Sequence, residues 1–238
     1  MRGYLILIFI FLSGFTFAQN SEFFDRADRF FMKYVKMGKV NYSELFNNRE
    51  ILDSLLTNID EMDPAWNSEA FEKAFYINAY NILVIKTVLD YYPISSPKDV
   101  DGFFDKVEHQ VAGNSITLDE LEFEYLFAKY KDPRLHFVLN CAASSCPTLY
   151  NRAIRPVDID DQLNFSTLMV IDRNDYVKVD HEKKVIRVSK IFDWYREMFE
   201  DQYSSVREFI NFNRFTTLPD DYEIHFMQYD WSLNDQKN

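Results

Sequence analysis

Both cysteines of the chain and one of its four histidines lie in a single short segment, Asp132 to Pro147, with the sequence DPRLHFVLNCAASSCP. Thiol and imidazole groups together serve nucleophilic catalysis, metal binding or disulfide formation. In a cysteine hydrolase the nucleophile is a thiolate and a nearby imidazole is its base. The segment therefore predicts a catalytic centre with Cys141 or Cys146 as nucleophile and His136 as base.

The same residues also fit two other kinds of site. In an oxidising compartment, a bridge between Cys141 and Cys146 would turn the segment into a rigid rim. Zinc is the weakest alternative, because Cys-x4-Cys with His136 supplies three clustered ligands and no second Cys/His pair follows. We expect neither a metal nor a cofactor, and the sequence leaves reactive thiols and a disulfide open.

Local geometry distinguishes the two cysteines. The apolar run from Leu135 to Cys141 predicts a strand, in which residues alternate faces and rise about 3.3 Å each. His136 and Cys141 would then point in opposite directions and lie roughly 16 Å apart. Cys146 follows a small-residue turn. If Pro147 begins a helix, the Cys146 thiol would lie at the positive end of that helix. The geometry therefore favours Cys146.

Two amides lie on the apolar face of a predicted helix that runs from Glu69 to about Tyr91 and is stopped by Pro93. A buried amide without hydrogen-bond partners costs on the order of 1–3 kcal/mol. Asn78 and Asn81 are therefore expected either to tie down a neighbouring loop or to line a polar binding pocket.

A carboxylate lies on the inner face of a second predicted helix. Thr117 and Glu120 have the spacing of a capping box, which begins a helix that extends to about Tyr130. Glu122 falls within its apolar stripe, so it is either neutralised by a partner or has a perturbed pKa. Glu122 is therefore a site candidate that could orient the His136 imidazole.

The remaining pattern predicts the fold class. Helical periodicity is present at residues 23–35, 49–59 and 156–171, and again after Ser189. Alternating residues predict a short strand at 107–111, a hairpin of strands 176–180 and 185–189, and a last strand at 223–229. Helices outnumber strands and alternate with them irregularly, which predicts an α+β fold, a helix-rich single domain around a small, mainly antiparallel sheet.

The N-terminus has the pattern of a secretory signal peptide. Arg2 precedes an apolar run from Tyr4 to Leu12, and Thr16-Phe17-Ala18 precedes Gln19. Cleavage after Ala18 would leave residues 19–238 as one exported domain, periplasmic or secreted. No stretch approaches the roughly 20 apolar residues of a membrane span, and a net charge of −12 disfavours nucleic acid as a partner.

Several segments together resemble the domain-of-unknown-function family 547, over nearly all of residues 19–238. They are Tyr76–Asn81, Leu118–Glu122, Asp132–Cys141 with Ser145–Pro147, Ile191–Tyr195 and Tyr229–Asn234. The resemblance suggests a papain-like, thiol-hydrolase relationship. It favours as site positions Asn78, Asn81, Glu122, His136, Cys141 and, less uniformly, Cys146, so the resemblance favours Cys141 where the geometry favours Cys146. Phe123 departs from the family pattern, since many relatives have histidine there, and an essential histidine at that place would make this chain inactive.

Two functions of different class are consistent with these observations. The first is a cysteine-dependent hydrolase or acyl transferase, with Glu122 or an asparagine orienting His136. The second is a non-catalytic domain with structural cysteines, in which Asn78, Asn81 and residues 132–147 form a pocket for a small molecule or a peptide. The sequence does not predict the oligomeric state.

Overall fold

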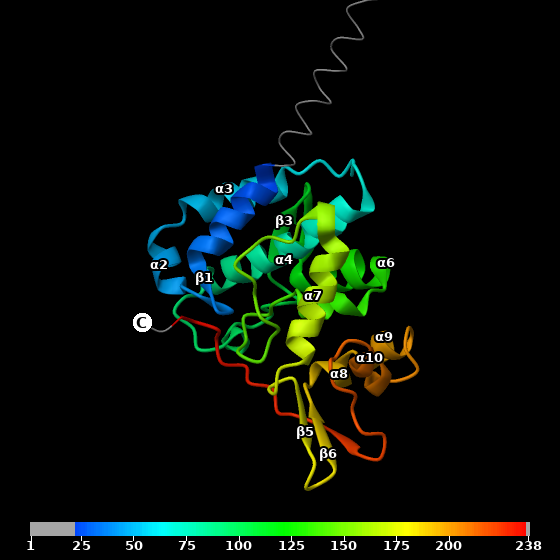
Figure 1. Cartoon of the computed structure of the whole chain (residues 1–238). Helices are drawn as coiled ribbons and strands as arrows, with labels where there is room; N and C mark the ends of the chain where they lie inside the picture. The colour runs from blue at the N-terminus through cyan, green and yellow to red at the C-terminus, as the bar shows by residue number, and fades with distance from the viewer. Residues whose placement is uncertain (1–21, 237–238) are drawn as a thin grey trace, which may run out of the picture.

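The computed structural model describes residues 22–236, so the predicted signal peptide lies outside the described residues (Figure 1). The described chain begins with a helix at 22–34 and a hairpin of β1 (Val35–Lys36) and β2 (Lys39–Val40). Helices α2 (Tyr42–Asn47) and α3 (Glu50–Asp60) follow. The two helices predicted for this region are confirmed.

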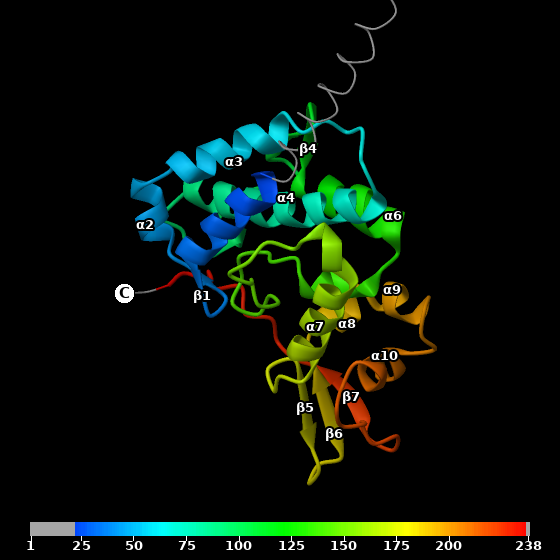
Figure 2. The same cartoon turned by 45° about the horizontal axis from the view of Figure 1, so that its top comes forward.

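Helix α4 (Glu69–Asp90) is the centre of the molecule, and other helices pack around it in both views (Figures 1 and 2). It begins at Ser68, whose side chain accepts a hydrogen bond from the Phe71 backbone amide, and it ends before Pro93 as predicted. Nearly all of its residues from Phe71 to Leu89 are buried, on every side of the helix. A helix that is apolar all round is expected to be a core element.

The capping box at Thr117 is confirmed, but the helix that follows it is irregular. A hairpin of β3 (Glu108–Val111) and β4 (Asn114–Thr117) leads into α5 (Leu118–Glu120). The Glu120 amide donates to the Thr117 hydroxyl, and the Glu120 carboxylate accepts from the Thr117 amide. The next segment, η2 (Leu121–Phe127), is a π-helix, and α6 (Ala128–Tyr130) completes the run. Such wide turns are common at functional sites.

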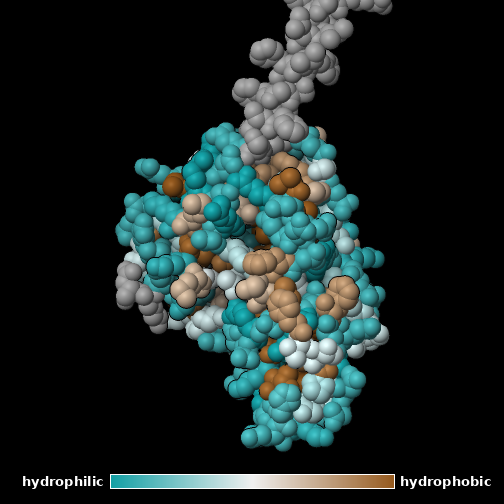
Figure 3. Space-filling view, in the orientation of Figure 1, coloured by the Kyte–Doolittle hydropathy of each residue, from teal (hydrophilic) through white to brown (hydrophobic). Residues whose placement is uncertain are grey.

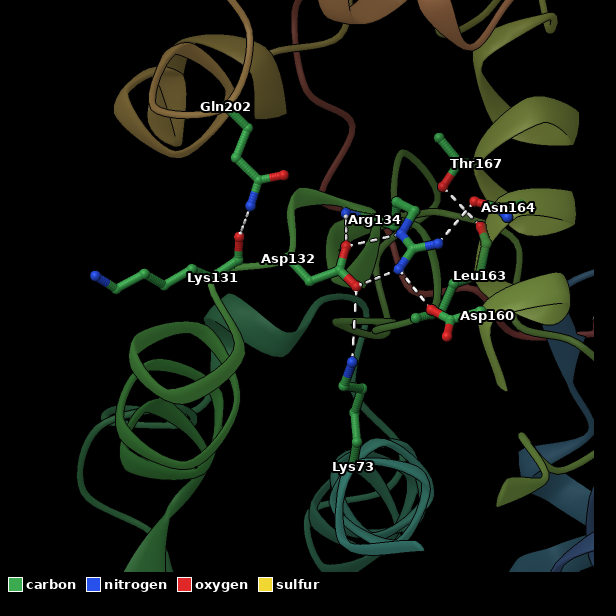
Figure 4. A network of polar contacts seen from close by, with 9 residues as sticks. All are labelled: Lys73, Lys131, Asp132, Arg134, Asp160, Leu163, Asn164, Thr167 and Gln202. Carbon is green, nitrogen blue, oxygen red and sulfur yellow. Dashed lines mark hydrogen bonds and ion pairs between the residues drawn. The ribbon is translucent and has the colours of Figure 1, made fainter. Parts of the chain in front are cut away.

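The strand predicted from Leu135 to Cys141 is wrong. The segment forms a 3-10 helix, η3 (Pro133–Phe137), and then irregular backbone. The physical reason is its start: Asp132 accepts a hydrogen bond from the Arg134 amide, and Pro133 occupies the first helical position. The Arg134 guanidinium group then donates hydrogen bonds to the Asp132 carboxylate and to the side chains of Asp160 and Asn164, which lie in the helix at residues 159–171 (Figure 4). These charged hydrogen bonds fix a helical turn where the apolar pattern alone indicates a strand.

The C-terminal half contains short elements around a three-stranded sheet. They are η4 (Pro156–Asp158), α7 (Ile159–Ile171), β5 (Val177–Asp180), β6 (Val185–Val188), α8 (Ile191–Trp194), α9 (Arg196–Glu200), α10 (Val206–Phe212) and β7 (Glu223–Phe226). Strands β5 and β6 form the predicted antiparallel hairpin, and β7 pairs parallel with β6. One further short helix, η1 (Pro97–Asp99), lies between α4 and β3. The fold is α+β, and its described strands form three small sheets that are mainly antiparallel.

Buried apolar residues form two clusters. The larger surrounds α4, and the smaller is built by β5 to β7 and α8 to α10, the lower part of the molecule in Figures 1 and 2. Phe137 of η3 and Ile171 of α7 belong to the smaller cluster, so these two elements join the two parts. On the face shown in Figure 3, hydrophilic residues cover most of the surface and hydrophobic ones form small groups.

The last described segment lies along the loop that contains the cysteines. Leu233 forms an antiparallel bridge with Ala143, and the Ser144 amide donates to the Ser232 carbonyl at 2.8 Å. The Asn234 amide donates to the Ala142 carbonyl at 2.9 Å. We call residues 229–236 the C-terminal strap. No helix within residues 22–236 is both long and apolar enough to cross a bilayer.

Candidate functional site

A cavity of about 240 Å³ lies where the two apolar clusters and the C-terminal strap meet. Cys141, Cys146, His136 and Glu122, the four residues predicted as catalytic, all line it. The predicted separation of His136 and Cys141 on opposite faces of a strand is therefore wrong, because no strand connects them. The other lining residues are Tyr80, Phe104, Asp119, Leu139, Pro147, Ile191, Trp194, Tyr195, Tyr229 and Trp231.

Cys141 and Cys146 are joined by a disulfide, with their Cα atoms 6.1 Å apart, and no free cysteine occurs in the described part of the chain. The Tyr229 hydroxyl lies 3.2 Å from each sulfur. Pro147 begins irregular backbone rather than a helix, so Cys146 does not lie at a positive helix end. In this form the two sulfurs are a rim of the cavity and neither is a thiolate.

Asn78 and Asn81 hold the loops behind the cavity and are not among its lining residues. The Asn81 side chain donates to the Val138 carbonyl at 2.8 Å and accepts from the Asn140 amide at 2.8 Å. Asn78 makes the same pair of bonds with Ile154, at 2.8 and 3.0 Å. Of the two expectations for these amides, the geometry matches the tying of neighbouring loops.

Asn140 extends this support into the cysteine loop. Its side chain donates to the Pro147 carbonyl at 2.7 Å and accepts from the Ala142 amide at 3.0 Å. The Asn234 side chain donates a second hydrogen bond to the same Asn140 Oδ1 atom, at 3.0 Å. The loop that carries the disulfide is thus fixed both by α4, through Asn81, and by the C-terminal strap.

Glu122 brings a buried carboxyl group to the cavity from the π-helical segment η2. The Tyr195 hydroxyl donates to Glu122 Oε1 at 2.9 Å. Burial raises the pKa of Glu122 to about 7, and nearby Asp119 acts in the same direction, while the hydroxyl groups of Tyr80 and Tyr195 lower it. Glu122 can therefore hold or release a proton near neutral pH, as a general acid or base must.

His136 is enclosed by aromatic rings. Its ring centroid lies 4.0 Å from that of Tyr195 and 4.3 Å from that of Phe127, and Nε2 contacts the Met198 sulfur at 3.0 Å. Burial lowers the pKa of His136 to about 3, so the imidazole is neutral at physiological pH. No carboxylate of residues 22–236 forms a hydrogen bond with this ring to raise its basicity.

One side of the cavity is an aromatic wall of Trp194, Tyr229 and Trp231, which was not predicted from the sequence. Tyr229 lies 4.8 Å from both Trp194 and Trp231, measured between ring centroids, and the two tryptophan rings are 5.9 Å apart. Trp194 is half exposed at the rim. Both segments that supply these rings, Ile191–Tyr195 and Tyr229–Asn234, stand out in the sequence, but neither carries periodicity that would place it at the cavity.

Comparison with known families adds one finding. The family model described as "Protein of unknown function, DUF547" matches residues 65–169. These residues belong to the DUF547 family. Neither the comparison with curated proteins nor that with solved structures gives a match.

The matched DUF547 region supplies one side of the cavity, namely α4, η2 and the cysteine loop. Tyr195 and the C-terminal strap lie beyond it. Phe123, the position at which the resemblance predicts a departure from the family, is half exposed and stacks on Tyr195 with 6.1 Å between ring centroids. It is not among the cavity-lining residues.

The described residues supply no obvious place for a metal. No group of three or more His, Cys, Asp or Glu side chains within residues 22–236 is arranged to hold an ion. The polar and sulfur groups that line the cavity are Glu122, Asp119, the tyrosine hydroxyls, His136 and the two sulfurs.

Proposed function

We propose that this DUF547 protein binds a small molecule in the cavity, with the Cys141–Cys146 disulfide as a structural rim. The observation that carries the proposal is the Glu122 carboxyl group, which is buried yet lines a cavity whose walls are largely aromatic. Small-molecule sites are typically apolar and aromatic, with a few placed polar groups, and they favour junctions between parts of a fold.

The disulfide-bonded geometry favours binding over thiol chemistry. A cysteine nucleophile requires a thiolate, whereas both sulfurs are bonded to each other. The neutral His136 ring faces Met198 and aromatic rings rather than a carboxylate that would orient it. Ligand binding in the cavity requires neither reduction of the disulfide nor protonation of His136.

A fragment screen by saturation-transfer NMR tests this function. We expect several compounds to bind the wild-type protein and to be displaced by one another. Leu139→Trp, which places a large ring in the cavity, should abolish binding, and Trp194→Leu at the half-exposed rim should weaken it without a risk to folding. Binding that persists in a folded Leu139→Trp variant, or no binding by the wild type, would contradict the proposal.

A second candidate is a cysteine-dependent hydrolase or acyl transferase that acts after reduction of the disulfide. The specific observation in its favour is that Cys141, Cys146, His136 and Glu122 all line one cavity. With its pKa about 7, Glu122 would be a better proton acceptor for a thiol than His136. Tyr229, near both sulfurs, would then donate a hydrogen bond to the thiolate.

Alkylation with iodoacetamide followed by mass spectrometry separates the two candidates. Binding with structural cysteines predicts a mass increase only after reduction. The hydrolase predicts that reduced protein cleaves an activated ester such as para-nitrophenyl acetate. That activity should disappear when Cys141→Ser and Cys146→Ser are combined, and full activity in the double variant would eliminate the mechanism.

We also propose that the protein is exported, periplasmic or secreted, after removal of residues 1–18. The disulfide supports this proposal, because such bonds persist mainly in oxidising compartments. Mass spectrometry of the protein from its native host should give a mature chain that begins at Gln19. A chain that retains its first residues in the cell would contradict export.

A further inference from the structure

We infer that the cavity selects a small organic cation, a quaternary ammonium compound, over neutral and anionic molecules of the same shape. The inference rests on the proposed function, that this cavity binds a ligand. It is carried by three features of the wall: its charge, its aromatic rings and the lack of a cationic partner for Glu122 among the described residues.

The charge of the wall excludes anions. Asp119 and Glu122 line the cavity, and none of the described lining residues is lysine or arginine. Lys190 forms an ion pair with Asp193 at 2.6 Å, and Lys98, which is not a lining residue, lies 4.1 Å from the centroid of the lining Trp231 ring. An anionic ligand would meet two carboxyl groups without a balancing charge, at a substantial desolvation cost.

The aromatic wall favours a cation over a neutral molecule. The faces of Trp and Tyr rings carry negative potential, and an ammonium group within about 6 Å of a ring centroid is attracted to it. Trp194, Tyr229 and Trp231 pack against one another at one side, with Tyr80 and Tyr195 next to Glu122. Lys98 already places its ammonium group over the Trp231 ring.

Glu122 lacks the partner that a cation would supply. In the described structure its contacts are tyrosine hydroxyls rather than a lysine or arginine. The titratable groups around it are Tyr80 on α4, Asp119 on α5, Tyr195 between α8 and α9, and Tyr229 on the strap. A bound ammonium ion would stabilise the ionised carboxylate, so binding releases a proton when Glu122 is protonated.

The volume limits the size of this cation. A cavity of about 240 Å³ is smaller than the roughly 300–1,000 Å³ of typical drug-sized sites. The ligand is therefore a small, separate molecule that consists of an ammonium group and a few carbon atoms. Choline and 3,3-dimethyl-1-butanol form a matched pair of probes, because they share one shape and differ in the charged nitrogen.

Isothermal titration calorimetry with these two probes tests the inference on the full-length mature protein. At pH 8 we expect choline to bind at least tenfold more tightly than the neutral alcohol. The choline affinity should rise about tenfold from pH 6 to pH 8, because the fraction of protein with ionised Glu122 rises accordingly. Glu122→Gln should remove the pH dependence and most of the preference, whereas Glu124→Gln, on the exposed side of η2, should change neither.

Four results would overturn the inference. Equal binding of the two probes would refute cation selection and leave ligand binding intact, and so would fragment hits without any choline binding. A choline preference unchanged in Glu122→Gln would refute the assigned carboxylate. Absence of both choline binding and fragment hits would refute the inference together with the proposed function.

Discussion

The Tyr195 hydroxyl donates a 2.9 Å hydrogen bond to Glu122, while the Tyr195 ring packs 4.0 Å from the ring centroid of His136. Tyr195 follows α8, which belongs to the smaller apolar cluster, whereas Glu122 lies on η2 beside α4. This pair therefore connects the two parts of the molecule at the cavity. A buried, protonatable carboxyl group at such a junction affects stability as well as function.

The first prediction concerns the effect of the buried Glu122 carboxyl group on the free energy of unfolding. Its folded pKa of about 7 lies above its ordinary value of 4.5, so the folded state binds the proton more tightly. The contribution of Glu122 to stability therefore falls as pH rises from 4.5 to 7, by up to about 3 kcal/mol in total. Glu122→Gln should be more stable than the wild type at pH 8, with a difference that shrinks toward pH 5, in urea unfolding monitored by circular dichroism.

Glu124→Gln is the matched control, because Glu124 lies on the same helical segment but is exposed. Its stability at pH 8, where the effect of Glu122→Gln is largest, should stay within about 0.5 kcal/mol of that of the wild type. A constant difference between Glu122→Gln and the wild type from pH 5 to pH 8 would show that Glu122 does not titrate near 7.

The second prediction concerns acid stability. Burial lowers the pKa of His109 to about 4 and that of His136 to about 3, from an ordinary value of 6.5. Both imidazoles therefore contribute stability that is present above pH 6.5 and lost as pH falls toward these values, at about 1.4 kcal/mol per pH unit each. In His109→Gln and in His136→Gln, the loss of stability between pH 7 and pH 5 should be smaller than in wild type by about 2 kcal/mol.

His181 provides the control for both variants. It lies in the turn between β5 and β6, where it is exposed and contacts only the Tyr222 hydroxyl among the described hydrogen-bonding groups. His181→Gln should change the free energy of unfolding by less than about 0.5 kcal/mol. If the two buried-histidine variants lose as much stability on acidification as the wild type, the histidines titrate normally in the fold.

The sequence predicted the elements better than the site. Helix α4, the Thr117 capping box and the β5–β6 hairpin follow from local patterns, because spacing and caps act within a few residues. The strand at Leu135–Cys141 fails because the Asp132 cap and Pro133 start a 3-10 helix, and because Arg134 bonds to Asp160 and Asn164 on α7, which are distant in sequence (Figure 4). An apolar run carries no information about such distant contacts.

Some residues of the site can likewise be predicted from local sequence, whereas others depend on distant contacts. Glu122 and the cysteine segment could be selected from their residue types, since a carboxylate on an apolar stripe and paired thiols are unusual anywhere. Tyr229 and Trp231 could not, because their place at the cavity depends on the strap pairing with Ala143 and Ser144. That pairing joins segments about 90 residues apart in the chain, and no periodicity records it.

The third prediction tests the support behind the cavity. Asn81→Leu removes the partners of the Val138 carbonyl and the Asn140 amide, both on the loop that leads to Cys141. Each buried group left without a partner costs about 1–3 kcal/mol, so the free energy of unfolding should fall by about 2–6 kcal/mol. Hydrogen exchange at the Asn140 amide should accelerate accordingly.

Asn47→Leu is the control for this variant. The Asn47 side chain donates to the Ser43 carbonyl within the same short helix, and the residue is exposed. Its substitution should cost less than about 0.5 kcal/mol. A cost for Asn81→Leu no larger than this would mean that the amide does not hold the loop.

The fourth prediction concerns the C-terminal strap. Asn234 is buried, accepts a hydrogen bond from the Tyr42 hydroxyl at 2.9 Å, and donates one to Asn140 at 3.0 Å. Asn234→Ala leaves the buried Tyr42 hydroxyl without this partner, so the protein should lose about 2–3 kcal/mol of stability. Combined with Tyr42→Phe, the loss should be smaller than the sum of the two single losses by about 1 kcal/mol, because the second change removes the unpaired hydroxyl. Strict additivity in this double-mutant cycle, measured by urea unfolding, would show that the strap is not held through Asn234 and Tyr42.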